Sequence, residues 1–172
     1  MAERHAVRGV VAGVAGGLLA AWVMNVWTAG PGTAISNKLE TPEEQEQLSA
    51  HSDGEDATMK AADKIASSVD RGQHLTHEQR ETGGPIVHYT FAALMGGLYG
   101  GLTEFSPVVN SGFGTTFGTA LFVGGDLIAV PALHLSGPLS DYPASSYASP
   151  FTAHLVYGAT TELVRRIVRA IL

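Results

Sequence analysis

Single ionisable side chains stand inside long apolar stretches of the sequence, at His88, Asp126, His134 and His154, and Tyr157 follows the last of these. If these stretches cross a bilayer, a central carboxylate costs about 2.5–3.5 kcal/mol, so the polar groups should face one another inside a helix bundle. Asp126 is then a candidate proton or cation site. The alternative is a structural carboxyl that forms hydrogen bonds with His88, His154 or Tyr157.

The histidines also raise the question of a metal. Two imidazoles on facing helices could ligate haem b, and three could hold zinc or copper. Each histidine stands alone in its apolar stretch, so the spacing identifies no ligand set. Interfacial histidines bonded to backbone or carboxylate are the simpler interpretation, and we expect no bound cofactor.

A second polar group ends the last apolar stretch. Glu162 precedes Arg165 and Arg166 by three and four residues. Side chains at these separations are neighbours on a helix. We therefore expect a structural ion pair between Glu162 and one of these arginines.

Four apolar stretches must position these side chains, at 7–29, 84–105, 112–135 and 150–168. A helix needs about 20 residues to cross the hydrocarbon layer. The first stretch is longer than the apolar core of a cleaved signal peptide. The pattern predicts an all-α fold, an integral membrane four-helix bundle, rather than a soluble bundle whose helices would each carry a polar face.

Glycines recur at every fourth position in three of the stretches. Small residues at this spacing let membrane helices pack with their backbones close together. We expect helix packing through Gly9, Gly13, Gly17, Gly96, Gly100, Gly114 and Gly118.

Charge sets the orientation. Arg4 and Arg8 precede the first stretch, while Arg165, Arg166 and Arg169 close the fourth. By the positive-inside rule both termini are cytoplasmic. The acidic segment between the first two stretches is then periplasmic.

This periplasmic segment, 36–82, should be helical. Capping boxes are predicted at Thr41 with Glu44 and at Thr76 with Gln79. Between them an apolar stripe has helical spacing and consists of Met59, Ala62, Ile65, Ala66 and Val69. Such a helix could cover the outer mouth of the bundle, although a solvated surface helix is the simpler expectation. Gly83 and Gly84 are interpreted as the turn into the second span.

In this topology we expect His88, His134 and His154 to lie at the same depth, near the outer face of the membrane. Asp126 precedes His134 by eight residues, which corresponds to about 12 Å greater depth in a helix.

Composition excludes several functions. The chain has 172 residues, a net charge of −6 and no cysteine, which argues against nucleic acid as a partner and removes thiol chemistry. The phosphate-loop, serine-hydrolase and zinc-protease motifs are all absent from the sequence.

The second half of the sequence resembles the YagU-like bacterial inner-membrane proteins, which have four predicted spans. The resemblance depends on VHYTFAALMGGLYGGLTE, IAVPALHLSGP and HLVYGATTELVRR. It implies motif positions at His88, Tyr99, Gly100, Glu104, Pro131, His154, Glu162 and Arg165. It implies no established reaction, only a tentative link to acid tolerance.

We therefore expect a non-enzymatic membrane protein, a structural or accessory subunit of a membrane assembly or a homo-oligomer, with a polar layer near the periplasmic face. A small transporter or proton conductor is the alternative. A haem- or metal-binding subunit is the third hypothesis.

Overall fold

The computed structural model describes residues 5–70 and 72–172, so Arg4 lies outside the described residues. All regular structure in this part of the chain is helical, which confirms the predicted all-α class. The longer helices are α1 (Ala6–Trp27), α2 (Thr33–Leu39), α3 (Pro42–His51), α4 (Ala57–Val69), α5 (His77–Thr103), α6 (Thr115–Leu121) and α8 (Ala148–Ile171), with the short α7 at Val130–Ala132. Two π-helical segments, η1 (Thr28–Gly32) and η3 (Phe122–Ala129), connect α1 to α2 and α6 to α7. Shorter 3₁₀ segments lie at Pro107–Gly114, Leu139–Asp141 and Ala144–Tyr147.

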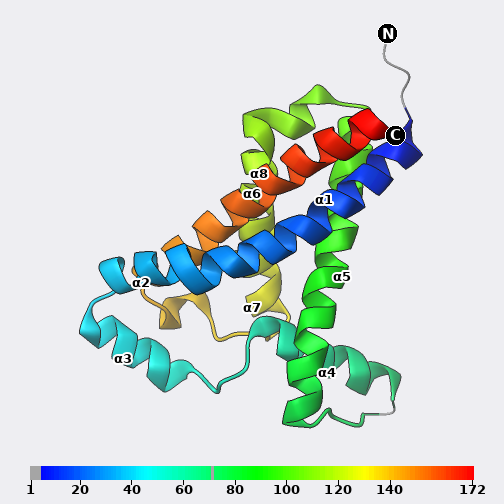
Figure 1. Cartoon of the computed structure of the whole chain (residues 1–172). Helices are drawn as coiled ribbons and strands as arrows, with labels where there is room; N and C mark the ends of the chain where they lie inside the picture. The colour runs from blue at the N-terminus through cyan, green and yellow to red at the C-terminus, as the bar shows by residue number, and fades with distance from the viewer. Residues whose placement is uncertain (1–4, 71) are drawn as a thin grey trace.

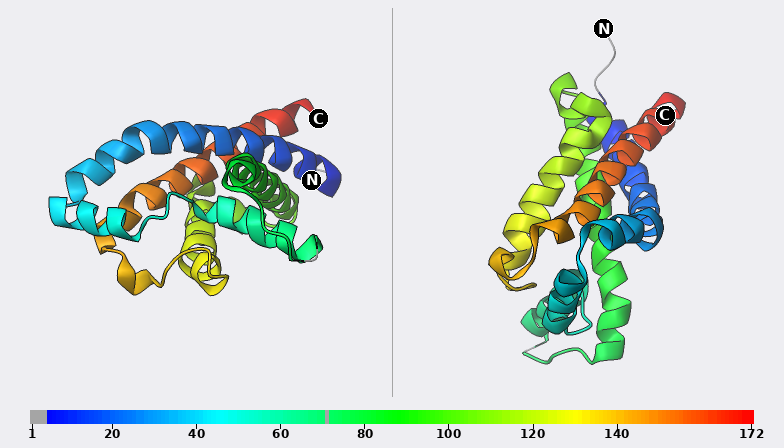
Figure 2. Two further views of the ribbon diagram at one scale, coloured as in Figure 1. Left: turned by 90° about the horizontal axis from the view of Figure 1, so that it is seen from below. Right: turned by 90° about the vertical axis from the view of Figure 1, so that its left-hand side faces the viewer.

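The long helices form a bundle with two different ends (Figures 1 and 2). One end holds the start of α1, the end of α8 and the connection 104–114, and we call it the terminal end. The opposite end carries α3, α4 and the connection 133–147, and we call it the distal end. Each long helical run therefore connects one end of the bundle to the other.

Glycine controls how closely the helices approach. A Cβ atom added at Gly13 of α1 would lie 2.1 Å from the Gly96 carbonyl oxygen of α5. One added at Gly16 would lie 2.7 Å from the Thr161 carbonyl oxygen of α8, so α1 contacts both neighbours through its backbone. On the other side of α8, a Cβ at Gly118 of α6 would lie 2.1 Å from the His154 carbonyl oxygen. The predicted glycine faces are thus all used for packing within this chain.

The distribution of apolar side chains is the reverse of that in a soluble bundle. Most of the apolar residues buried between α1, α5 and α8 are small, such as Ala12, Ala20 and Ala92, and the large exceptions are Tyr99 and Tyr157. Large apolar side chains point outward instead, with Leu94 of α5 62% exposed and Ile167 of α8 54% exposed. Exposed large apolar surface on a monomer indicates contact with a membrane or a protein partner.

Two helical runs have the length and composition needed to cross a membrane, Ala6–Leu39 and Pro107–Ala132. The first run contains the predicted first span, 7–29, and the second overlaps the predicted third span, 112–135, over residues 112–132. The first run extends past its predicted end because η1 continues the helix through Pro31. The second begins earlier than predicted because the 3₁₀ segment Pro107–Gly114 precedes α6.

In the distal segment between α2 and α5, the capping boxes form at the helix starts where the sequence predicts them. Thr41 and Glu44 form a capping box at α3, and Thr76 and Gln79 form one at α5. Of the apolar stripe on α4, Met59 and Ala62 are buried, whereas Val69 at its far end is 81% exposed. Helix α4 therefore covers the distal end with its first half instead of lying free as a solvated helix.

The interpretation of Gly83 and Gly84 as a turn is wrong. Helix α5 runs without interruption from His77 through Pro85. Both glycines instead permit close contact with α4, because a Cβ would lie 2.8 Å from the Ala62 Cβ at one position and 2.9 Å from the Met59 Cγ at the other. The glycines mark a helix crossing, not a break.

A charged network holds α4 against the start of α5. Arg80 Nη1 donates to Glu55 at 3.0 Å and its Nε lies 3.4 Å from Asp63 Oδ1. Hydrogen bonds from His77 and Arg80 lower the pKa of Glu55, and a hydrogen bond from His74 lowers the pKa of Asp63. Carboxylates with a lowered pKa stabilise the folded state above their ordinary pKa, and this stabilisation is lost as the pH falls through the folded-state value.

The glycine contact can be tested by adding one methyl group. We expect Gly13→Ala to destabilise the bundle by about 1–3 kcal/mol, because α1 and α5 must separate to admit it. Gly30→Ala is the control, since nothing lies within 4 Å of a Cβ there. Thermal unfolding in detergent micelles, followed by circular dichroism, measures the difference. Equal stability of the two variants would contradict the close α1–α5 contact.

The network at Arg80 can be tested by hydrogen exchange. We expect Arg80→Gln to speed amide exchange throughout α4 and leave the buried part of α8 unchanged, because it releases Glu55 and Asp63 together. Lys60→Gln serves as the control, since it removes an ion pair with Asp53 whose carboxylate is 58% exposed. In the wild type, acidification should speed exchange in α4 once intrinsic rates are corrected. Unchanged protection of α4 in Arg80→Gln would show that apolar packing alone holds it.

Candidate functional site

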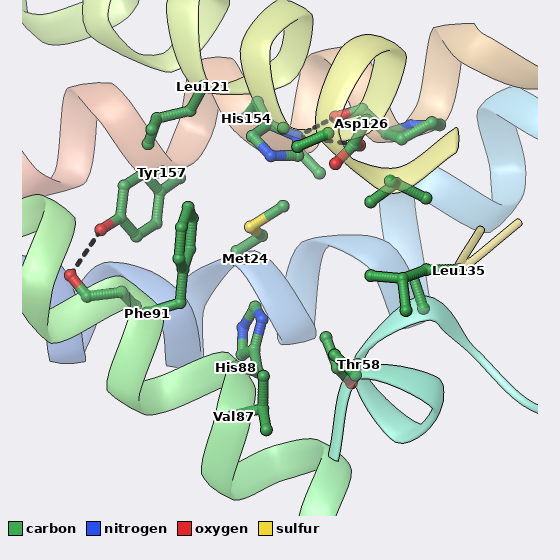
Figure 3. Close-up of a pocket in the computed structure, with 18 of the residues that line it drawn as sticks. Met24, Thr58, Val87, His88, Phe91, Leu121, Asp126, Leu135, His154 and Tyr157 are labelled. Atoms are coloured by element: carbon green, nitrogen blue, oxygen red, sulfur yellow. Dashed lines mark hydrogen bonds and ion pairs between the residues drawn. The ribbon is translucent and has the colours of Figure 1, made fainter. Parts of the chain in front are cut away.

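A cavity of about 510 Å³ lies in the distal half of the bundle. All four long helical runs and the start of α4 contribute to its wall (Figure 3). Most of the lining side chains are apolar, among them Met24, Phe91 and Leu121. Four of the five residues predicted to form a polar layer also line it, namely His88, Asp126, His154 and Tyr157.

His154 and Asp126 form one side of the cavity. The Nδ1 atom of His154 lies 2.9 Å from the Pro150 carbonyl oxygen and 3.7 Å from Asp126 Oδ2. A carbonyl can only accept, so Nδ1 carries the hydrogen, and Nε2 of the neutral ring is an acceptor. The distance to Asp126 is too long for a hydrogen bond. The two side chains are therefore neighbours, with the Asp126 carboxylate not bonded to His154.

Helix geometry brings this pair together. Gly118 lets α6 approach the backbone of α8 at His154, and the π-helical segment η3 then carries Asp126 along the same wall. The contact puts Asp126 at the level of His154, not deeper as predicted. The prediction assumed a regular helix as far as His134, whereas the helix ends at Ala132 and is π-helical from Phe122.

His88 approaches from the opposite wall, on α5 (Figure 3). Its ring packs edge-on against Tyr89, with ring centroids 5.5 Å apart. Its Nε2 atom is buried and forms no hydrogen bond with any described residue. Buried polar atoms in native proteins usually have a partner, so an unpaired one calls for an explanation.

Tyr157 closes the cavity toward the terminal end. Its hydroxyl donates to the Ala92 carbonyl oxygen at 2.9 Å, which links α8 to α5. The donor of Tyr157 is thereby used, and its oxygen can only accept a further bond.

His134 does not join this site. It is exposed, it is not among the lining residues, and its φ of 53° is left-handed. The chain leaves α7 in a Schellman motif, with the Leu135 N–H bonded to the Val130 carbonyl and the His134 N–H bonded to the Pro131 carbonyl. This motif turns Leu135 inward, where it is buried, and His134 outward. The expected layer of three histidines therefore contains two.

Among the described residues, no group of three or more histidine, aspartate or glutamate side chains is arranged to hold a metal ion. The structure gives no support to a site formed by three histidines. Haem ligation by His88 and His154 stays the third hypothesis, which an absorption spectrum of the purified protein tests.

The second polar group lies near the terminal end and is fully bonded. Glu162 is 0% exposed and accepts from Arg165 Nε at 2.8 Å, from Arg166 Nε and from the Tyr99 hydroxyl at 2.8 Å. The structure thus brings Glu162 together with both arginines instead of one. Beside this cluster, Arg169 of α8 pairs with Glu104, which directly follows α5, through two hydrogen bonds of 2.7 and 3.1 Å. These charged side chains are paired with one another, whereas the neighbouring Thr161 Oγ1 is buried without a hydrogen-bond partner among the described residues.

Some lining residues were not predicted. Ala57, Thr58 and Ala61 reach the cavity from α4, and Asn25 and Thr28 reach it from the end of α1. The apolar stripe of α4 was the available signal, since Thr58 is next to its first member, Met59. The sequence does not reveal that this stripe covers the cavity.

Comparisons with known proteins give a family. No curated protein and no solved structure matches the chain. The model of one family, described as protein of unknown function (DUF1440), matches residues 60–163, which include α5 to α7, most of α8 and every polar residue of the cavity except Asn25, Thr28 and Thr58. The chain belongs to the DUF1440 family.

Proposed function

We propose that this protein is a four-span integral membrane protein that binds a small lipophilic molecule in its distal cavity and catalyses no reaction. The observation that carries the proposal is the combination of an apolar cavity with an outer surface of large apolar side chains. Cavities of roughly 300–1,000 Å³ with apolar walls and a few convergent polar groups are typical ligand sites.

We propose that α5 and α8 also cross the membrane, in addition to the two apolar runs Ala6–Leu39 and Pro107–Ala132. Helix α5 exposes Leu94, Leu98 and Leu102, and α8 exposes Leu163 and Ile167, as lipid-facing helices would. Glu162 and Arg165 of α8, in contrast, are buried inside the bundle, whereas Arg166 near the end of the helix is exposed. Both helices therefore fit a bilayer better than water, although each carries several charges at its end.

The orientation follows from charge. Arg8, Arg165, Arg166 and Arg169 belong to the terminal end, and the acidic segment belongs to the distal end. Positive residues favour the cytoplasmic side. We propose that both termini are in the cytoplasm of a bacterium and that the cavity is in the periplasmic half.

An accessory or self-associating role stays a prediction. The glycine faces give it no support, because they are occupied by helices of the same chain. Purification in mild detergent tests it, since a monomer without associated proteins would count against this role.

A small transporter or proton conductor is the second candidate, favoured by the Asp126 carboxylate, which forms no hydrogen bond with the described residues. Flux measurements in proteoliposomes, with Asp126→Asn as the control, test it.

The absence of cysteine allows a direct test of the number of spans. With four spans, single cysteines at Ser68 and Ser140 should react with an impermeant maleimide from the periplasm, and a cysteine at Ser111 should not. With only the two most apolar runs in the bilayer, Ser68 and Ser111 would be periplasmic and Ser140 cytoplasmic. All three serines are exposed, so each substituted thiol is accessible to the reagent.

Neighbouring glycines allow a test of the cavity. Neither Gly124 nor Gly125 has an atom within 4 Å of an added Cβ, but only Gly125 lines the cavity. We expect Gly125→Leu to weaken binding of the neutral probe 1-naphthalenemethanol by about tenfold or more, because the side chain fills the space that the ligand needs. Gly124→Leu should bind like the wild type.

Isothermal titration of the protein in lipid nanodiscs, with empty nanodiscs subtracted, measures both variants. Absence of binding by the wild type, or equal binding by Gly125→Leu, would rule out the cavity as a site for lipophilic molecules.

A further inference from the structure

We infer that the cavity binds a lipophilic amine in its protonated form, with the ammonium group against Asp126. This inference rests on the proposed function and specifies its ligand. Its basis is the hydrogen-bonding state of the polar atoms on the cavity wall.

The wall offers acceptors and few donors. The hydrogen of His154 Nδ1 is used by the Pro150 carbonyl, which leaves Nε2 as an acceptor. The hydrogen of the Tyr157 hydroxyl is used by the Ala92 carbonyl, which leaves only the lone pairs of the oxygen. Asp126 in its ionised form only accepts. A ligand that satisfies this wall must therefore donate hydrogen bonds.

Charge favours a cation among such donors. Asp126 has an accessible side chain, 35% exposed, in a cavity that is lined by no lysine or arginine of the described residues. A carboxylate in apolar surroundings is costly unless it is paired, and no described residue donates a hydrogen bond to it. A bound cation would provide the missing partner, whereas an anion would be repelled by the same carboxylate.

A primary ammonium group, which has three N–H donors, fits the acceptors on one wall. Asp126 and His154 Nε2 supply two of them. His88 faces this wall from the opposite side, with Met24 between them (Figure 3), and its Nε2 atom is buried without a hydrogen-bond partner in the described part of the chain. The ammonium group therefore belongs at the Asp126 wall.

The rest of the cavity fits an apolar body. Phe91 and Tyr157 stand together on one side of the polar groups, and Leu135 lies toward the other side (Figure 3). Aromatic side chains also attract cations through the faces of their rings. The ligand class is therefore an aryl or alkyl amine, not a metal ion or a polyamine with several charges.

Two probes of the same shape test the inference on the full chain in lipid nanodiscs. They are 1-naphthylmethylamine, which is protonated at pH 7, and its neutral counterpart 1-naphthalenemethanol. We expect the wild type to bind the amine about tenfold more tightly than the alcohol or better. In Asp126→Asn this preference should disappear while the affinity for the alcohol is kept. Asp141→Asn, which changes a carboxylate outside the cavity lining, should keep the preference.

The outcomes separate this inference from the proposed function. If the alcohol binds and the amine binds no better, the inference fails and the proposed function stands. If neither probe binds the wild type, both fail. A preference for the amine that survives in Asp126→Asn would also overturn the inference. Should Asp126→Asn bind neither probe, Asp126→Ser is judged by the same criterion.

Discussion

Contact between helix backbones is the constraint on which the rest of the structure depends. At Gly13 and Gly118 a neighbouring carbonyl occupies the space of a missing Cβ, so the helices approach more closely than any larger side chain allows. Close approach of this kind replaces the large apolar core of a soluble bundle, because lipid tails compete with apolar side chains for contact. It also frees residues such as Leu94 and Ile167 to face outward.

The same packing divides the bundle into a tightly packed terminal half and a distal half that holds the cavity. Near the terminal end, glycines bring the helices together and Glu162 receives hydrogen bonds from three side chains, so a buried charge is fully compensated. In the distal half the π-helical segments η1 and η3 interrupt the regular helices, and a cavity lies beside both of them. Segments of π-helix frequently occur at functional sites. Here η3 carries Asp126, which receives no hydrogen bond from a described residue, while the unpaired His88 Nε2 lies across the cavity on α5.

Local sequence signals predicted local structure well. The capping boxes at Thr41 and Thr76 form, because each depends on residues only three positions apart. The glycine spacing predicted which helix faces pack closely. It does not reveal that these faces contact other helices of the same chain instead of a partner protein. The inward turn of Leu135 escaped prediction because histidine, not glycine, takes the left-handed position of the Schellman motif. The role of Gly83 and Gly84 depends on α4, which no local pattern brings to α5.

The asymmetry between the two ends limits what the cavity can do in this state. A molecule that enters from the distal end meets Tyr157 bonded to Ala92, and behind it the buried cluster of Glu162. Passage to the terminal end would require α8 to move away from α5, which breaks the bonds of Glu162 with Tyr99 and of Arg169 with Glu104. Bonds to a buried, fully compensated carboxylate are costly to break. The structure therefore favours binding and release on one side, and transport would need a second arrangement of α8 in which Glu162 keeps its arginines while Tyr99 and Glu104 lose their partners.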